Sequence, residues 1–377
     1  MNFEEIVKRT RAYNCLGCAV CTGSCPISRT SPGYSPRLTV RKAVFGFEKR
    51  VEEDPDLWSC LTCGTCSSRC PYDVDYVEFI KSIRIEVFQL GRHGLYSHNG
   101  LMQTIMEIMT KNPPQRRISW ISQNLTTSST SDYLYFVGCL PYFEIIFEDI
   151  GAKCLDIAKN AIKILNSVKI NPIVSSQELC CGHDLLWSGD LESFKKLAGY
   201  NLKLIEKSGA KKVIFTCPEC FHTIKEEYPK YFGPQEFQPI HISQFLSRLV
   251  EDNGIEFNQI KARMTYQDPC RLGRFEEIYE EPRKVINHIP GVKFIEMERD
   301  RSNSLCCGTT GWINCDNCSK QIQKERLNQA KSTGAEILIT GCPKCQIHLK
   351  CALSSLDMEL EIKDITNLAG EALTVDL

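Results

Sequence analysis

The sequence predicts an α+β protein of several domains: a mainly helical N-terminal domain followed by two copies of a Rossmann-like α/β domain. Three observations predict this arrangement. Two closely spaced cysteine motifs open the chain, short apolar runs alternate with amphipathic stretches after residue 133, and the second half of the chain repeats itself. The 377 residues have a globular composition, 42% hydrophobic and 24% charged, which excludes a collagen, a coiled coil and a disordered tail.

The N-terminal domain, residues 1–110, carries one cysteine motif twice. Both copies have the spacing C-x2-C-x2-C-x3-C-P. In this spacing the first three thiolates hold one [4Fe–4S] cluster and the fourth ligates the other. We therefore expect one cubane cluster on Cys15, Cys18, Cys21 and Cys70, and a second on Cys60, Cys63, Cys66 and Cys25. Two zinc sites are the alternative, because C-x2-C is also a zinc spacing, but the closely packed third cysteine and the duplication favour cubanes.

Two amphipathic helices are expected around the second motif. Within residues 31–50, Val40, Val44 and Phe47 recur at helical spacing. The same segment carries the cations Arg37, Arg41, Lys42, Lys49 and Arg50. They form either a solvated face or a set of charges that offsets anionic clusters or docks a partner. Residues 76–90 have the pattern of another amphipathic helix.

Composition marks the boundary that follows. Residues 111–132 are rich in Pro, Ser, Thr and Asn, which is typical of a linker. We therefore place the first α/β domain at residues 133–255 and the second at residues 256–377.

Charge and cysteine content narrow the class of protein. The formal net charge of −1 gives no basic field for binding nucleic acid. The first residues lack the apolar core of a signal peptide, and no apolar run has the ~18–20 residues of a membrane anchor. We therefore expect a cytoplasmic protein, and in a reducing compartment 22 cysteines are metal ligands more often than disulfides.

A second set of cysteines shows that residues 133–377 are a duplication. The first copy contains Cys139, Cys180, Cys181, Cys217 and Cys220, and the second contains Cys270, Cys306, Cys307, Cys342 and Cys345. Both have a CCG triplet and then a C-P-x-C motif. Equivalent cysteines are 131, 126 and 125 residues apart, measured at the first cysteine, the triplet and the C-P-x-C motif. An offset this constant indicates a repeated domain.

The surroundings of these cysteines predict a parallel sheet. Residues 133–139, 211–217, 263–270 and 336–342 are short apolar runs that each end at a cysteine. Residues 154–168 and 194–209 have helical periodicity. Strands that alternate with helices form parallel sheets, and ligands gather at the carboxyl ends of such strands. The cysteines therefore lie where a ligand is expected.

Five cysteines per copy exceed the four that a cubane or a zinc ion requires. Two adjacent cysteines do not easily point at one small tetrahedral centre, and they suit an extended cluster with two points of ligation. A zinc site that uses four of the five is the alternative.

These motifs resemble those of heterodisulfide reductase. The CCG pattern is similar to that of its B component, and SPRLTVRKAVFG with WSCLTCGTCSSRCPYDVDYVEFI is similar to its C component. Joined in the order C then B, the chain resembles the D component or a B–C fusion. The resemblance implies that each complete set of five cysteines holds a noncubane [4Fe–4S] cluster. It also implies that the two clusters reduce a disulfide of the CoM-S-S-CoB type.

Two functions follow from this resemblance. The first is an oxidoreductase subunit that passes electrons from a flavin-containing partner, similar to the A component of the same enzymes, through the cubanes to a small-molecule disulfide. The second is a non-catalytic electron-relay subunit of a larger dehydrogenase or reductase complex, because relatives of that kind share this layout. The chain has no dinucleotide-binding G-x-G-x-x-G after a strand, so both hypotheses need a separate electron donor.

Several residues near the cysteines have open roles. His183, His222 and His348 could give a proton to a leaving thiolate, or bond to the cluster surroundings. Lys344 and Arg271 could attract an anionic substrate or be structural. Cys315 and Cys318 are expected on one face of a helix, where they either pack or form an extra metal or redox site.

Overall fold

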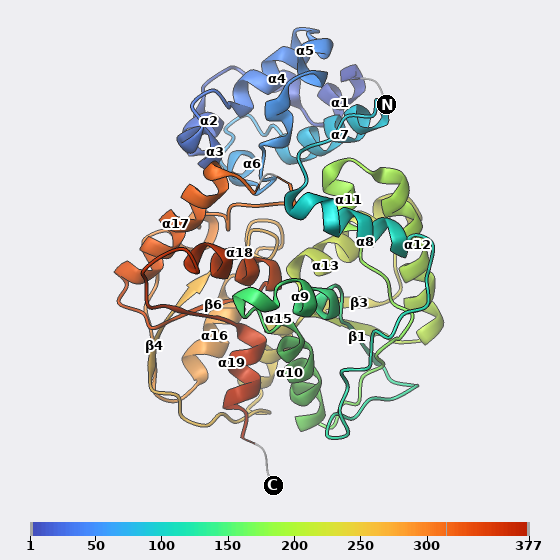
Figure 1. Cartoon of the computed structure of the whole chain (residues 1–377), viewed down its shortest axis with the longest axis vertical. Coiled ribbons are helices and arrows are strands. Elements are labelled where there is room, and N and C mark those ends of the chain that lie inside the picture. The colour runs from blue at the N-terminus through green and yellow to red at the C-terminus, as the bar shows by residue number, and fades with distance from the viewer. Residues whose placement is uncertain (1–2, 314, 375–377) are drawn as a thin grey trace. The chain divides into compact units, whose positions relative to one another are not determined.

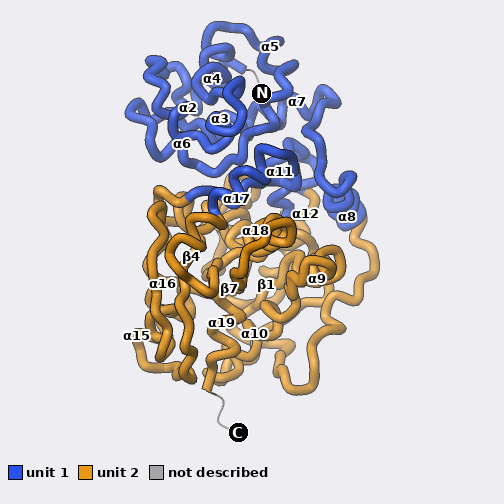
Figure 2. The backbone as a smooth tube through the Cα atoms, turned by 60° about the vertical axis from the view of Figure 1, so that its left-hand side comes forward, with its two compact units in different colours: residues 1–110, 182–195, 305–326 blue, residues 111–181, 196–304, 327–377 orange. Residues whose placement is uncertain are grey.

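The computed structural model describes residues 3–313 and 315–374, which fall into two compact units (Figure 2). Unit 1 comprises residues 1–110, 182–195 and 305–326, and unit 2 comprises residues 111–181, 196–304 and 327–377. Unit 1 thus contains the N-terminal segment together with one segment from each repeat. The domain boundaries proposed from composition stay predictions.

Unit 1 is helical, as expected. The cap residues explain where two of its helices begin: the Ser35 hydroxyl accepts from the Leu38 N–H at 3.3 Å, and the Asp75 carboxylate accepts from the Glu78 N–H at 3.0 Å. The helices are α1 (Phe3–Arg9), α2 (Val20–Ser24), α3 (Pro26–Thr30), α4 (Pro36–Val44), α5 (Glu48–Glu52), α6 (Thr65–Ser68), α7 (Tyr76–Gln89), α8 (Leu101–Met109) and α11 (His183–Ser188) (Figure 1). Helices α12 (Leu191–Ser208) and α17 (Asn317–Ser332) contribute residues to both units.

The apolar stripe expected across residues 31–50 is interrupted. Helix α4 ends at Val44 and α5 begins at Glu48, and between them Gly46 adopts a φ of +74°, which glycine tolerates without a steric cost. Phe47, expected on one face with Val40 and Val44, is exposed instead. The sequence periodicity was therefore misleading at Phe47.

Unit 2 contains two parallel sheets, which confirms the predicted α/β class. One sheet has the order β1-β2-β3 and the other β5-β4-β6-β7. In the register, Phe136 pairs with Phe215, and Thr340 pairs with Gln267 and Asp364. The strands are β1 (Tyr133–Phe136), β2 (Lys212–Phe215), β3 (Gln238–His241), β4 (Ala262–Gln267), β5 (Val292–Phe294), β6 (Ile337–Thr340) and β7 (Glu361–Asp364).

The helices of unit 2 pack across the two repeats. Helix α10 of the first repeat packs on α19 of the second, and α16 of the second packs on α15 of the first. Across the first of these contacts, Asn160 donates to Asn367 at 3.0 Å and Lys163 to the Gly370 carbonyl at 2.7 Å. Such an exchange of equivalent helices is the pattern of a pseudo-twofold relation. The helices are α9 (Leu140–Ile146), α10 (Cys154–Ser167), α13 (Pro218–His222), α14 (Tyr228–Phe232), α15 (Ile242–Glu251), α16 (Glu280–His288), α18 (Pro343–Leu353) and α19 (Ile365–Ala372) (Figure 1).

The core of unit 2 lies around strands β1, β2, β4 and β6. Leu134, Val213, Met264 and Leu338, one from each of four strands, are fully buried. This explains why these short runs are apolar throughout, since strands of a covered parallel sheet are shielded on both faces. Among the described helices, none combines the length and the apolar character needed to cross a bilayer.

Candidate metal centres

The eight cysteines of the N-terminal motifs line two cavities of unit 1. Cys15, Cys18, Cys21 and Cys70 line the first, and Cys25, Cys60 and Cys63 line the second, while Cys66 borders both. The fold therefore brings Cys70 to the first motif and Cys25 to the second, in the crossed arrangement expected from the spacing. The ligand assignment itself stays a prediction.

The surroundings of these thiols fit an iron–sulfur cluster. Backbone N–H groups point at sulfur: Thr62 donates to the Cys60 Sγ at 3.3 Å and Val74 to the Cys70 Sγ at 3.4 Å. Burial raises the pKa of Cys25 to about 12, and burial with the neighbouring thiols of Cys60 and Cys63 raises the pKa of Cys66 well above its usual value. A cluster that bound here would have to displace the protons of these thiols, so its binding would release protons.

Arg84 of α7 connects the second motif to the first repeat within unit 1. Its side chain is fully buried and donates to the carbonyl oxygens of Cys60 at 2.8 Å and Trp187 at 3.1 Å. On the same helix, the Lys81 ammonium lies 5.2 Å from the centre of the Trp187 ring. Arg84 was not predicted from the sequence, although a cation in the middle of an apolar helix is a signal that could have found it.

Thr62 makes the corresponding contact to the second repeat. It lies between Cys60 and Cys63, and its Oγ1 is 3.1 Å from the Oγ1 of Thr310, which follows the second CCG triplet. The loop of the second motif therefore contacts, within unit 1, the segments that follow both triplets.

All five cysteines of the first repeat come together in unit 2. Cys139 follows β1, Cys217 follows β2, and Cys220 lies in α13. A hydrogen bond with Cys180, followed by burial, raises the pKa of Cys139. Hydrogen bonds with Cys181 and Cys217, followed by burial, raise the pKa of Cys220 in the same way. The thiols are thus in mutual contact at the carboxyl ends of the strands, which is where a ligand was expected.

Side chains far away in the sequence hold the loop of the first CCG triplet. The Asn201 amide of α12 accepts from the Leu179 N–H at 2.9 Å and donates to the Cys180 carbonyl at 2.9 Å. The Tyr228 hydroxyl donates to the Cys181 carbonyl at 3.0 Å. These bonds fix the backbone of both adjacent cysteines.

A buried ion pair, Glu178 with Arg117, binds the backbone of Gly138 next to Cys139. The Glu178 carboxylate accepts from the Gly138 N–H at 2.7 Å and from the Arg117 guanidinium at 3.0 Å. Arg117 also donates to the Gly138 carbonyl and lies over the Tyr142 ring. Burial raises the pKa of Glu178 to about 7, against the opposite effect of Arg117. Arg117 belongs to the stretch 111–132, so that segment contributes a buried residue to the site rather than only connecting domains.

The cysteines of the second repeat are divided between the units. Cys270 follows β4, Cys342 follows β6 and Cys345 lies in α18, all in unit 2, whereas Cys306 and Cys307 belong to unit 1. The Cys342 Sγ accepts from the Cys345 N–H at 3.4 Å, which caps α18. The grouping of all five stays a prediction.

The two C-P-x-C motifs meet through their variable residues. Lys344 and Glu219 form an ion pair at 2.7 Å, in which the side chain of Lys344 is 4% exposed and that of Glu219 14%. Helices α13 and α18, which carry Cys220 and Cys345, are therefore joined at their first turns. Lys344 thus has a structural partner in addition to the substrate role considered from the sequence.

The remaining candidates near the cysteines are also buried. The Nδ1 of His222 lies 2.6 Å from the Oε1 of Glu276 in the second repeat. Burial lowers the pKa of His222. The Arg271 guanidinium lies 4.2 Å from the centre of the Phe275 ring. His183 and His348 are buried as well.

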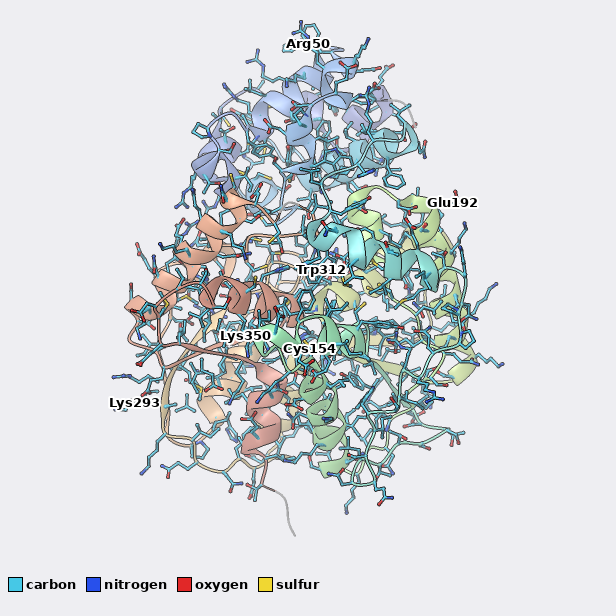
Figure 3. All side chains as sticks on the ribbon, in the orientation of Figure 1. Arg50, Cys154, Glu192, Lys293, Trp312 and Lys350 are labelled. Carbon is cyan, nitrogen blue, oxygen red and sulfur yellow. The ribbon has the colours of Figure 1, made fainter. Side chains whose placement is uncertain are left out.

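The cysteines outside the motifs occupy dissimilar places. The expectation that Cys315 and Cys318 share a helix face is wrong, because α17 begins at Asn317 and Cys315 is exposed before it. Cys154 is buried at the start of α10, near Lys350 (Figure 3).

Comparison with known proteins gives matches along most of the chain. The family described as a 4Fe-4S dicluster domain matches residues 11–74, and the cysteine-rich domain family CCG matches residues 133–225 and 264–350. The D component of dihydromethanophenazine:CoB–CoM heterodisulfide reductase from Methanosarcina barkeri is 30% identical, over 95% of this chain and 93% of that protein.

More distant relatives carry other names. The B component of fumarate reductase (CoM/CoB) from Methanothermobacter marburgensis is 26% identical, over 99% of this chain and 75% of that one. EtfAB:quinone oxidoreductase from Syntrophomonas wolfei is 22% identical, over 96% and 58%. Among solved structures, a hypothetical protein from Helicobacter pylori has a TM-score of 0.56 and 11% identity, over 92% of this chain and 70% of that one. That likeness concerns the fold alone.

Proposed function

This chain belongs to the family of the heterodisulfide reductase D component, as an iron–sulfur oxidoreductase subunit; from that premise we propose that it reduces a small-molecule disulfide. The proposed electron donor is a flavin-containing partner protein, similar to the A component of such reductases. The proposed cofactors are two cubane and two noncubane [4Fe–4S] clusters, held by the cysteines named above. We also propose a cytoplasmic location, where 22 cysteines stay reduced.

The completeness of both five-cysteine sets carries this proposal. A subunit that only relays electrons does not need two extended sites, whereas splitting one S–S bond between two sites does. The ion pair of Glu219 and Lys344 supports the proposal, because it joins the two helices that carry one ligand from each set. We propose that both sets act on the same disulfide.

The reaction is RSSR + 2e⁻ + 2H⁺ → 2 RSH, and iron–sulfur clusters supply its electrons one at a time. The chain's own residues have two tasks. Asn201 and Tyr228 fix the backbone of Cys180 and Cys181, so that both thiolates keep their positions when a ligand binds or leaves. Arg84 and Thr62 fix the loop of the second motif against the segments that follow both triplets.

A relay function is the second candidate. It is favoured by the relatives named as part of a fumarate reductase and as a quinone oxidoreductase, which match nearly all of this chain. On that hypothesis the two five-cysteine sets pass electrons to another protein, and no disulfide binds between them.

The decisive experiment is metal analysis combined with electron paramagnetic resonance of the anaerobically purified protein. Reductase activity predicts about 16 Fe with matching sulfide and no zinc, and a new paramagnetic signal when thiols are added to the oxidised protein. About 8 Fe with zinc would exclude disulfide reduction at the CCG sites. About 16 Fe without a response to thiols would favour the relay.

Variants of the adjacent cysteines test the same point by turnover. We expect Cys181→Ala and Cys307→Ala each to abolish reduction of the disulfide while the N-terminal clusters remain reducible by dithionite. Cys351→Ala, outside the motifs, is the matched control and should retain turnover. Persistent turnover in both motif variants would show that the catalytic assignment is wrong.

A further inference from the structure

Exposed apolar side chains are concentrated around the first cysteine motif. Thirteen large apolar residues are exposed in the described chain, and six of them fall within residues 13–47. We call these six the apolar face: Tyr13, Leu16, Val20, Leu38, Phe45 and Phe47. Single exposed apolar residues are normal, whereas a contiguous exposed apolar patch is typical of an interaction surface.

The apolar face borders the cavity of the first motif. Leu16 and Val20 lie between the cysteines of that motif, and Leu16 is 74% exposed. Cys18 is itself exposed, whereas Cys60, Cys63 and Cys66 of the second motif are buried. A partner covering Leu16 therefore approaches the first cluster site more closely than it could approach the second.

Helix α4 extends this surface away from the cysteines. Arg37 lines the cavity of the first motif and donates to the Gly17 carbonyl at 3.4 Å, which attaches α4 to the cysteine loop. Leu38, Arg41 and Phe45 follow at helical spacing, and all three are exposed. They form a stripe on the side of α4 opposite to the buried Val40 and Ala43.

Positive charge accompanies the apolar face. The Arg41 guanidinium lies 5.4 Å from the centre of the Phe45 ring, and that of Arg50 lies 5.1 Å from the Phe47 ring. Arg50, labelled in Figure 3, lies at the periphery of unit 1. Arg41, Lys49 and Arg50 are exposed, whereas Lys42 pairs with Asp54 at 2.5 Å. Three exposed cations therefore border the apolar face.

We propose that the apolar face is the docking surface for an electron-carrier protein whose own docking face is acidic. The inference rests on the proposed function and concerns the surface where its electron donor docks; in the test below an acidic ferredoxin stands in for that donor. Acidic side chains would be steered by Arg41, Lys49 and Arg50, and the apolar residues would exclude water beside the first cluster site. A small apolar centre with a charged rim suits the transient complexes of electron transfer.

The test is the rate at which a reduced carrier reduces the protein's clusters. The probe is an acidic two-[4Fe–4S] ferredoxin, and dithionite serves as a small reductant that needs no docking. Arg41→Glu combined with Arg50→Glu reverses two charges of the surface. Lys203→Glu combined with Lys207→Glu makes the same change on exposed residues of α12 and is the matched control.

We expect the ferredoxin rate to fall at least about tenfold at low salt in the Arg41/Arg50 variant, with a weaker dependence on salt. Reduction by dithionite should not change. Leu16→Asn should slow the ferredoxin reaction at all salt concentrations, because it alters the apolar contact and leaves the charge unchanged. The control variant should behave like the parent protein.

Three outcomes would overturn the proposal. One is an equal ferredoxin rate in the Arg41/Arg50 variant and its control. Another is binding of the parent, but not the variant, to vesicles of anionic lipid without an effect on the ferredoxin rate, which would make the surface a membrane contact. The third is a dimer of the parent that Leu16→Asn dissociates. Dithionite-driven disulfide reduction tests the proposed function separately, since it bypasses this surface.

Discussion

Arg84 places a positive charge beside the second cluster site, in a fully buried position. A nearby cation stabilises the reduced form of a cluster, which carries one more negative charge. We therefore predict that Arg84→Met lowers the reduction potential of the second N-terminal cluster. Arg84→Lys keeps the charge but loses the forked hydrogen bonds, and it should retain most of the potential. Redox titration followed by electron paramagnetic resonance measures both, and equal shifts in the two variants would assign the effect to geometry instead.

The buried carboxyl group of Asp364 predicts how the stability of the protein depends on pH. Burial raises the pKa of Asp364 to about 7, even though its carboxylate accepts from the Thr366 N–H at 2.8 Å at the start of α19. As the pH rises from about 4 to about 7, the unfolded chain releases this proton while the folded chain keeps it. The free energy of unfolding therefore decreases across that range, by up to ~4 kcal/mol from this group.

Asp364→Asn tests the pH effect because asparagine retains an oxygen for the cap but cannot ionise. We expect the denaturation temperature of the variant, relative to the parent, to rise between about pH 4 and about pH 7 and then to level off. Anaerobic thermal denaturation of both proteins gives this difference. A difference that does not vary with pH would show that Asp364 has an ordinary pKa in the folded protein.

At the scale of single residues, the sequence predicts which cysteines come together better than it predicts the side chains that hold those cysteines in place. Spacing alone associated Cys70 with the first motif and Cys25 with the second, and the fold brings them there. No pattern associates Arg117 with Glu178, which is 61 residues away, because a buried ion pair has no periodic signature. Such pairs become visible only when the fold brings their elements together.

At the scale of elements, α11 packs closely on α7. Gly189 ends α11 with a φ of +99°, and a Cβ there would lie 2.4 Å from the Arg84 carbonyl oxygen. We predict that Gly189→Ala destabilises the protein by about 2–4 kcal/mol, from backbone strain together with the collision. Gly91→Ala is the control: its φ is +77°, but a Cβ would meet nothing within 4 Å, so only about 1 kcal/mol of strain is expected. Thermal denaturation should separate the two variants by several degrees, and equal losses would refute close packing at Gly189.

Strands and helices were predictable where a single local sequence pattern determines them. The strands that precede Cys139 and Cys217 were expected at residues 133–139 and 211–217, and they occur at 133–136 and 212–215. Short apolar runs of this length, rich in aromatic or β-branched residues, are typical of a covered strand. The helix expected over residues 31–50 was less predictable, because periodicity extends past Val44 whereas the backbone turns at Gly46. Phe47 fits the helical period but is exposed, and it belongs to the apolar face. An apolar residue at helical spacing is therefore not always a core residue.

At the scale of the whole molecule, the duplication explains the position of one ion pair. Glu219 and Lys344 are equivalent residues, offset by the same 125 positions as Cys217 and Cys342, and they contact each other at 2.7 Å. Residues related by a twofold axis touch their own equivalents only near that axis. The sequence revealed the repeat but not the position of its axis, which depends on how α10 and α15 pack on the other copy's helices.

Exchanging the two residues provides the last prediction. Glu219→Lys and Lys344→Glu each place two like charges in a buried site, and each should cost about 3–5 kcal/mol. The double exchange restores the pair with the roles of the two repeats reversed, and it sets a carboxylate at the first turn of the longer helix α18, which that end favours. We therefore expect the denaturation temperature to recover. If Lys344 also attracts an anionic disulfide, turnover driven by dithionite should stay low in this stable double variant. Recovery of both properties would limit the pair to joining the repeats, and failure of stability to recover would show that the pair does not hold them together.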